Sequence, residues 1–280
     1  MNLRYIVPRL LRHFLPQPIV RFLLQRSLII RPGLETSDPR AAANQYITVL
    51  SQQGVDLDGK KVLIFGYGGR FALGVELLLL GVEHVILCDK YALPDDRQNS
   101  KLLPDYQKYL QLTDNHVCTN PTFITLIESD IRDRDVYQRL PPVDIVVSTS
   151  VYEHLDDVDG ITCALASLTN SDGVHLHFID LRDHFFKYPF EMLTFSENVW
   201  KRWLNPTSNL NRYRFLDYQR IFETYFEKSS FLILDRNDAA FKACKPRIRP
   251  EFLTGDPEID SVTHLQVLAR SPHSINKSQE

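Results

Sequence analysis

Cysteine is scarce in this sequence, and its four copies lie far apart along the chain. No two of them form a C-x-x-C pair, and they form no cluster with histidine at the spacing typical of metal sites. Neither a metal site nor a disulfide framework is therefore expected, and a reducing cytoplasmic compartment fits. The cysteines are Cys88, Cys118, Cys163 and Cys244.

An excess of basic residues is also missing, since 32 Lys and Arg stand against 35 Asp and Glu, for a net charge of -3. Nucleic acid is therefore not an expected partner, because duplex binding rests on a basic face that neutralises several phosphates. No apolar run approaches the roughly 18 to 20 residues that span a bilayer. The 44% of hydrophobic residues is ordinary for a globular protein and predicts one large α/β domain with additions.

Acidic residues are absent from the N-terminal 34 positions, where arginines alternate with leucine, isoleucine and phenylalanine. We expect residues 1–38 to form a basic amphipathic arm that Pro8, Pro16 and Pro18 split into short helices. No small-residue cleavage site follows an apolar core, which argues against a secretory signal. Three interpretations are open: a helical flap on the domain, an interfacial anchor to an anionic membrane, and a transit peptide. The arginines are Arg4, Arg9, Arg12, Arg21, Arg26 and Arg31.

From about residue 60, short apolar runs alternate with longer helical patterns, which is typical of a mostly parallel sheet covered by helices on both faces. Most of these runs are continuously apolar, as expected for strands buried on both sides. We predict a doubly wound, seven-stranded sheet within residues 39–270, with the last, more alternating strand nearer an edge. The predicted strands are Lys61–Phe65, His84–Cys88, Thr122–Ile127, Asp144–Ser148, Val174–Ile179, Phe231–Leu234 and Thr263–Ala269.

Two long excursions interrupt this alternation, the first over Tyr91–Pro121 and the second over Phe185–Arg214. The stretch Phe185–Arg214 has no clear strand, and we expect it to be a lid over the active site because such long excursions tend to carry function. The stretch Tyr91–Pro121 predicts one helix around Lys101–Leu112. The tail from 271 to 280 is expected to be disordered.

A glycine turn, Gly66-Tyr67-Gly68-Gly69, follows the first predicted strand and precedes a helical pattern rich in leucine. Glycine permits the sharp turn and a close approach of a ligand, and the helix start offers free N–H groups. The second strand ends at Asp89-Lys90, where a carboxylate could accept both hydroxyls of a ribose. This pair fits either a nicotinamide dinucleotide or S-adenosylmethionine. Phe71 stands where the dinucleotide pattern has glycine or alanine, which disfavours the first.

The next two strand ends discriminate between these cofactors. The third strand ends in Glu128-Ser129-Asp130-Ile131, and the fourth continues from Asp144 into Ser148-Thr149-Ser150-Val151-Tyr152-Glu153-His154-Leu155. The order of glycine turn, acid, acid-apolar pair and D-x-V-V-S-x-S-V-x-E-H-L resembles the class I (Rossmann-like) S-adenosylmethionine-dependent methyltransferases, over roughly residues 40 to 270.

This resemblance implies roles for individual residues. Gly66 and Gly68 of the turn would contact the amino-acid part of S-adenosylmethionine, Asp89 the ribose, Asp130 the adenine amine and Ile131 the adenine face. Ser148 and Thr149 would line the methionine side. The sequence departs from the family at Ile64, where an acid is common, so another group must hold the cofactor's amino end. Taken alone, Asp130 could equally be a helix N-cap.

The fifth strand carries a dense set of candidate bases, in His177-Phe178-Ile179-Asp180-Leu181-Arg182-Asp183-His184. His184 is the preferred general base, because imidazole titrates near neutrality and Asp183 or Asp180 could orient it. His177 and His154 are rivals. His177 could instead be a core histidine, and His154 could cap the helix after strand four.

The run Arg212-Tyr213-Arg214, with Trp200 from the preceding excursion, is the candidate substrate contact, since paired guanidiniums bind carboxylate or phosphate. The alternative is a salt-bridged helix start that uses Asp217.

Two motifs that are missing from the sequence narrow the class of methyl acceptor. No N-P-P-[YF] run follows the fourth strand, as base-modifying methyltransferases require, and the glutamate pair of protein-arginine enzymes is missing. O-methylation of a small hydroxylated metabolite, whether a sugar, a lipid-linked compound or a secondary metabolite, is the function that remains. The alternatives are a nicotinamide-dependent oxidoreductase and a catalytically silent methyltransferase-like binding protein.

Overall fold

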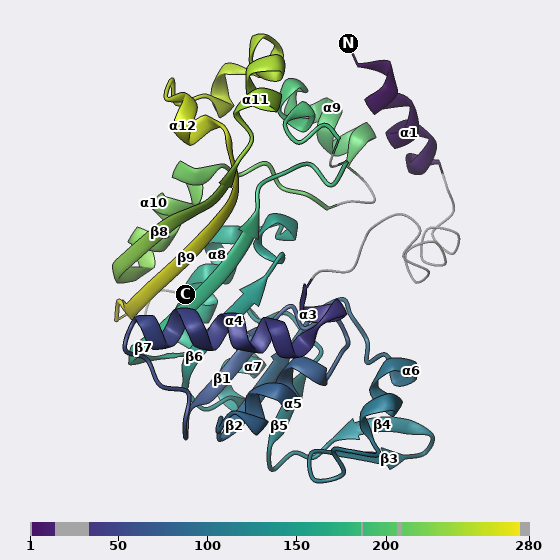
Figure 1. The fold of residues 1–280 in the computed structure, drawn as a ribbon, viewed down its shortest axis with the longest axis vertical. Helices are drawn as coiled ribbons and strands as arrows, with labels where there is room; N and C mark the ends of the chain where they lie inside the picture. The colour runs from purple at the N-terminus through teal and green to yellow at the C-terminus, as the bar shows by residue number, and fades with distance from the viewer. Residues whose placement is uncertain (1, 15–33, 186, 206–208, 275–280) are drawn as a thin grey trace.

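The computed structural model describes residues 2–14, 34–185, 187–205 and 209–274, and Figure 1 shows their arrangement. The strands are β1 (Lys61–Phe65), β2 (His84–Cys88), β3 (Leu110–Thr113), β4 (His116–Thr119), β5 (Ile124–Ile127), β6 (Val143–Thr149), β7 (Thr169–Asp180), β8 (Phe226–Arg236) and β9 (Val262–Pro272). The α-helices are α1 (Leu3–His13), α3 (Leu34–Ser37), α4 (Pro39–Gln52), α5 (Ala72–Leu79), α6 (Asp96–Asn99), α7 (Arg134–Arg139), α8 (Val158–Ser167), α9 (Glu197–Val199), α10 (Phe215–Tyr225), α11 (Asp238–Cys244) and α12 (Pro257–Asp260). Short helical turns are η1 (Ser100–Leu102), η2 (Tyr152–His154), η3 (Glu191–Thr194), η4 (Trp200–Leu204), η5 (Lys245–Arg247) and η6 (Pro250–Phe252).

One seven-stranded sheet, in the order β5-β2-β1-β6-β7-β9-β8, forms the centre of the molecule. The pairs from β5 to β7 are parallel, whereas β9 runs antiparallel to both β7 and β8. This confirms the predicted fold class and all seven predicted strands. The alternating last run, β9, lies second from the edge, and β8 forms the edge itself.

Helices cover both faces of the sheet, as the continuous apolar strands predicted. Side chains of α4 and α5 pack with Ile64 of β1 in one core, and side chains of α8 and α10 pack with Leu63 in the other. Successive strand residues therefore point into opposite layers. In Figure 1, α4 and α5 lie in front of β1 and β2, and α8 and α10 lie beside β8 and β9. No described helix combines the length and the apolar composition that crossing a membrane would need.

The first excursion differs from its prediction. In place of one helix over Lys101–Leu112, the chain forms α6 and η1 and then the antiparallel hairpin of β3 and β4. The hairpin turns at Asp114 and Asn115, which both have positive φ, of 51° and 66°. Asp and Asn tolerate this conformation better than other side chains, so the D-N pair was the available signal for a hairpin.

The N-terminal arm packs on the second excursion. Helix α1 runs through Pro8, so the prediction that Pro8 divides the arm is wrong. Tyr5 is fully buried in a third apolar cluster, which includes Trp200 of η4 and Phe241 of α11. These contacts stabilise a helix that its proline alone would weaken. The other prolines of the arm, Pro16 and Pro18, lie outside the described residues. So do Arg21, Arg26, Arg31 and residues 275–280 of the tail, whereas β9 includes 271 and 272.

Candidate functional site

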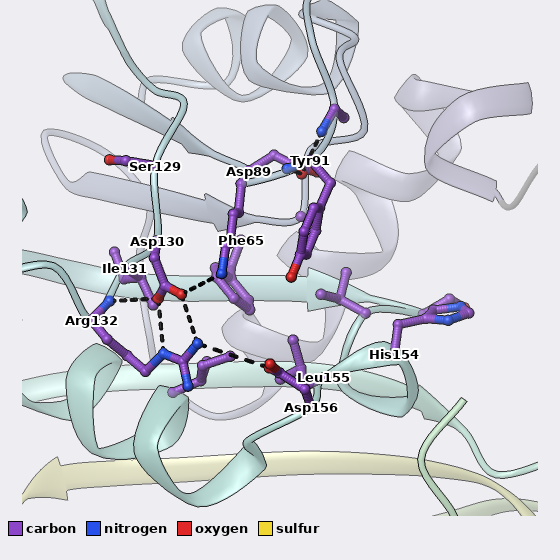
Figure 2. Close-up of a pocket in the computed structure, with 16 residues that line it drawn as sticks. Phe65, Asp89, Tyr91, Ser129, Asp130, Ile131, Arg132, His154, Leu155 and Asp156 are labelled. Carbon is purple, nitrogen blue, oxygen red and sulfur yellow. Dashed lines mark hydrogen bonds and ion pairs between the residues drawn. The ribbon is translucent and has the colours of Figure 1, made fainter. Parts of the chain in front are cut away.

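A cleft of about 370 Å³ opens at the carboxyl ends of the parallel strands. The chain leaves β1 for β2 on one side, and β6 for β7 on the other, so the strand order reverses between β1 and β6. Open α/β sheets bind ligands at this reversal. The cleft is lined by Phe65, Gly66, Asp89, Lys90, Tyr91, Ala92, Ser129, Asp130, Ile131, Arg132, Ser150, Val151, His154, Leu155, Asp156 and Ile161 (Figure 2).

The glycine turn forms the floor of this cleft at Gly66. Its φ is +81°, and a Cβ there would stand 2.3 Å from a methyl group of Val151. No other residue fits this position without moving the segment after β6. Gly68 also has positive φ, but the space beside it is open. Tyr67, Gly68 and Gly69 of the same turn do not line the cleft.

Asp89 links the glycine turn to the end of β2. Its Oδ2 accepts the N–H of Gly68 at 3.2 Å, and its Oδ1 accepts the N–H groups of Tyr91 and Ala92 at 2.8 and 2.9 Å. Three backbone donors therefore fix the carboxylate at the cleft, and about one of its four lone-pair sites is left to accept a further hydrogen bond. A ribose diol is a ligand that such a carboxylate could hold.

Asp130 stands at the end of β5 and is bound on both sides. Arg132 donates from its backbone N–H, Nε and Nη2 at 2.6–3.0 Å, and Lys90 donates from Nζ at 2.9 Å. The hydrogen bonds from Arg132 hold the pKa of Asp130 well below its usual range. The N-cap interpretation is wrong, because α7 begins after Asp133. Ile131 follows with its side chain at the cleft (Figure 2).

The side chains at the end of β6 do not lie where the sequence predicted them. Ser148 is fully buried, and its hydroxyl forms a 2.7 Å hydrogen bond with Nδ1 of His177. The Thr149 hydroxyl lies 2.7 Å from the Tyr46 hydroxyl on α4. The residue that reaches the cleft is Ser150, with a φ of 55°. Strand alternation alone could not place it, because the turn out of β6 changes the direction of the chain.

A carboxylate from outside the predicted domain reaches this strand end. Glu35 of α3 accepts a hydrogen bond from the Tyr46 hydroxyl, which also contacts Thr149. Burial raises the pKa of Glu35 to about 7. Glu35 is the first acid after the arginine-rich arm, but nothing in its sequence context relates it to the fourth strand. It was therefore missed.

The candidate bases separate into two groups. His177 is fully buried beside His175, and burial lowers its pKa to about 3, so it is the core histidine of the alternative interpretation. His154 does not cap the next helix, since Asp157 caps α8, and it lines the cleft instead. The rings of His154 and His184 meet with centroids 4.8 Å apart. Burial, followed by the charge of His154, lowers the pKa of His184 to about 4.

Both predicted acids have partners other than His184. Asp183 is fully buried and accepts hydrogen bonds from Tyr5 and Arg9 of the arm. Asp180 pairs with Arg182 at 2.7 Å and with His264 at 3.5 Å. Burial alone would raise the pKa of Asp180, but hydrogen bonds from His264 and Arg182 hold this pKa below its usual range. Arg182 is a sequence neighbour of Asp180, but sequence proximity could not reveal Tyr5, Arg9 or His264 as partners.

The residues predicted to contact the substrate are instead engaged in contacts within the protein. Arg214 begins α10, as the alternative interpretation held, but its guanidinium donates to the carbonyls of Leu181 and Val262 at 2.7 Å, and only its backbone N–H donates to Asp217. Arg212 donates to the carbonyls of Met192 and Phe195 and to Glu197. Trp200 is buried, and its Nε1 donates to the carbonyl of Leu210. Tyr213 packs against the ring of Tyr218. None of these side chains lines the cleft.

No protein-family profile matches the sequence, and no curated protein matches it in sequence. Many solved structures match its fold. The CurJ carbon methyltransferase is 13% identical, with a TM-score of 0.50, over 94% of this chain and 62% of that one. A putative sarcosine dimethylglycine methyltransferase from Galdieria sulphuraria is 13% identical, also with a TM-score of 0.50, over 84% of this chain and 85% of that one. The chain has the Rossmann-like fold of the S-adenosylmethionine-dependent methyltransferases.

Proposed function

We propose that this chain is an S-adenosylmethionine-dependent methyltransferase with its cofactor in the cleft between β1, β2, β5 and β6. The observation that carries the proposal is the joint placement of Gly66, Asp89 and Asp130-Ile131 around one cleft, at successive strand ends of this fold. Asp89 would accept the ribose hydroxyls. Ile131 and the aliphatic wall around it would hold the adenine, with Asp130 at its edge.

The cofactor's amino end has a candidate partner in Glu35. The strand position that usually carries an acid is Ile64, which is fully buried in the apolar core. Glu35 reaches the end of β6 through Tyr46 and Thr149, next to Ser150 at the cleft. A carboxylate there could pair with the ammonium group, as the missing strand acid would.

The reaction we propose is transfer of the methyl group to an oxygen of a small hydroxylated metabolite, which can be a sugar, a lipid-linked compound or a secondary metabolite. The oxygen attacks the methyl carbon in line as the bond from carbon to sulfur breaks, which releases S-adenosylhomocysteine, and the hydroxyl proton passes to a base. The protein therefore has mainly to align the two reactants. The candidate proton acceptors are His154, which lines the cleft, and His184, whose ring contacts that of His154.

We also propose that the protein acts in the cytoplasm and that α1 contacts the membrane surface peripherally. One face of α1 is buried through Tyr5 and Arg9, whereas the opposite face exposes an apolar row. Arg4 lies beside this row and is exposed, so the surface suits anionic lipid headgroups. The row consists of Leu3, Val7, Leu11 and Phe14.

Calorimetric titration of the purified protein with S-adenosylmethionine, S-adenosylhomocysteine, NADH and NADPH tests the cofactor. We expect binding of the first two only; binding of a nicotinamide cofactor alone would establish the oxidoreductase alternative. Incubation with methyl-labelled cofactor and metabolite extracts then tests turnover. Cofactor binding without transfer to any acceptor would favour the silent binding protein.

The substitution His184→Ala tests the proton acceptor. We expect it to lower turnover by roughly 10² or more with little change in cofactor affinity. Full activity of this variant would exclude His184 from the reaction.

A further inference from the structure

Three potential metal ligands meet where the cofactor cleft borders the second excursion. They are Glu153 and His154 of η2 and His184 from the segment after β7, and one ligand atom of each lies within 4.8 Å of the others. They come together because β6 and β7 are adjacent and parallel, so that both segments leave the same edge of the sheet. Sequence spacing could not show this group, since about one strand and one helix separate His154 from His184.

Glu153 supplies an independent reason to expect an occupant. The residue is only 3% exposed, and neither carboxylate oxygen accepts a hydrogen bond of good geometry from the residues that the structure describes; only the backbone N–H groups of Glu153 itself and of Asp180 lie toward it. A buried carboxylate without a partner costs several kcal/mol, and proteins rarely keep one unless it is protonated or neutralised by a cation. The two neighbouring groups that complete the cluster are imidazoles, which are common metal ligands.

We propose that Glu153, His154 and His184 bind a divalent transition-metal ion. Two imidazoles and one carboxylate suit Mn²⁺, Fe²⁺, Co²⁺, Ni²⁺ or Zn²⁺ better than Mg²⁺ or Ca²⁺, which prefer oxygen ligands. Bonds of roughly 2.0–2.2 Å to one ion would draw the ligand atoms slightly closer together than they now lie. Three protein ligands leave coordination positions open to a further molecule.

The position of this site gives the ion a use, which rests on the proposed function. His154 lines the cleft, and Figure 2 places it apart from Asp130 and Arg132, at the other end. If the adenine lies at Asp130, the methyl acceptor approaches from the end at His154. An ion there would bind an acceptor oxygen, orient it toward the methyl carbon and lower its pKa. His154 and His184 would then act as ligands of the ion, and the acceptor proton would pass to solvent instead of to an imidazole. A methyl acceptor with two neighbouring oxygen atoms would fill two of the open coordination positions of the ion.

Titration of chelator-treated, dialysed full-length protein with Co²⁺ tests the site, because the visible absorption of Co²⁺ reports its ligands. We expect one equivalent to bind to the wild type. Glu153→Gln and His184→Ala should each weaken this binding at least about 10-fold, since the first removes the negative charge of a direct ligand and the second removes a ligand altogether. His116→Ala is the matched control, because His116 is exposed, pairs with Asp96 and lies outside the cluster. That variant should bind Co²⁺ as the wild type does.

Two outcomes would overturn the proposal: no Co²⁺ binding by the wild type, and equal binding by the wild type and Glu153→Gln. Glu153→Gln keeps the shape of the side chain and removes an unpaired buried charge, so it should fold even if His184→Ala does not. S-adenosylhomocysteine titrated into the same samples separates this proposal from the cofactor proposal. Loss of Co²⁺ binding with intact cofactor binding would identify a metal ligand, whereas a wild type that binds Co²⁺ and no cofactor would refute only the proposed function.

Discussion

Asp89 is the residue on which we expect cofactor affinity to depend most directly. Asp89→Asn keeps the size of the side chain but removes the charge that would accept the ribose hydroxyls. Because a hydrogen bond to a charged group contributes about 1.5–3 kcal/mol, the affinity for S-adenosylhomocysteine should fall about 10-fold or more. Asp105→Asn, at an exposed position away from the cleft, is the control and should bind normally when both are measured by calorimetry. Equal affinities would remove Asp89 from the site.

The raised pKa of Glu35 predicts that cofactor binding depends on pH. Burial raises its pKa to about 7, so the side chain is an anion above pH 7 and increasingly neutral below it. Only the anion can pair with the cofactor's ammonium group. The dissociation constant of S-adenosylhomocysteine should therefore rise as the pH falls from 8 to 6, by up to about 10-fold.

The substitution Glu35→Gln should remove this dependence and weaken binding at pH 8. Glu83→Gln, on the exposed connection before β2, is the control and should keep the pH profile of the wild type. A profile unchanged in Glu35→Gln would show that another group holds the amino end.

Some residues of the site could be predicted from the sequence because their neighbours in the chain fix their place. Gly66 and Asp89 follow directly after β1 and β2, and Asp130 follows three residues after the end of β5, so the end of each strand carries them to one edge of the sheet. Asp183 and Arg214 could not be placed this way. Their partners, Arg9 and the carbonyl of Val262, come from distant segments that local patterns do not reveal.

At the scale of elements, α1 is held to the second excursion by a buried ion pair. Arg9 and Asp183 are 7% and 0% exposed, and Arg9 also donates to the carbonyl of Leu204 at 2.8 Å. Arg9→Met should destabilise the protein by about 3–5 kcal/mol, because it leaves Asp183 buried without its cation. The measurement is urea-induced unfolding at neutral pH. Arg4→Met, on the exposed side of the same helix, should change the free energy of unfolding by less than about 0.5 kcal/mol.

A double variant identifies the pair itself. Asp183→Asn removes the charge that Arg9→Met would leave unpaired, so the two effects together should be smaller than their sum. Strictly additive effects would mean that α1 is held by Tyr5 and the apolar contacts alone.

The strands could be predicted better than the connections between them. Most of the strands are continuous apolar runs that only a sheet covered on both faces can bury, so their pattern is nearly unambiguous. The excursion before β5 has no such constraint, and the predicted helix over 101–112 proved to be η1 and half of a hairpin. Its leucines and lysines suit a helix locally, but contacts with α6 and β5 decided the conformation.

The exposed row on α1 predicts binding to anionic vesicles. Leu3→Ser, Val7→Ser and Leu11→Ser together remove most of the apolar surface and leave the buried face of the helix intact. The wild type should float with vesicles that contain phosphatidylserine, and the triple variant should not. If neither floats, α1 is a structural flap only, and the membrane proposal is wrong.

At the scale of the whole molecule, the cleft lies at the ends of the parallel strands, which pair with one another without interruption. Four strands border the cleft, and they lie side by side in the order β5, β2, β1 and β6, each hydrogen-bonded to the next. The residues that would contact the cofactor come from the ends of these strands. The second excursion and α1 lie beyond β7, outside this group. The residues that we propose to bind the cofactor therefore come from the sheet, and we expect the segments beyond β7 to select the acceptor.

This division predicts how ligands change the stability of the entire chain. A ligand that binds only the folded state adds about 2.7 kcal/mol at 100 times its dissociation constant. For a domain of this size, that corresponds to a rise in Tm of roughly 5 °C or more. S-adenosylhomocysteine should produce such a shift in differential scanning fluorimetry, NADH should not, and Asp89→Asn should need about 10-fold more S-adenosylhomocysteine to reach it. A shift with NADH alone would place a dinucleotide at the reversal between β1 and β6.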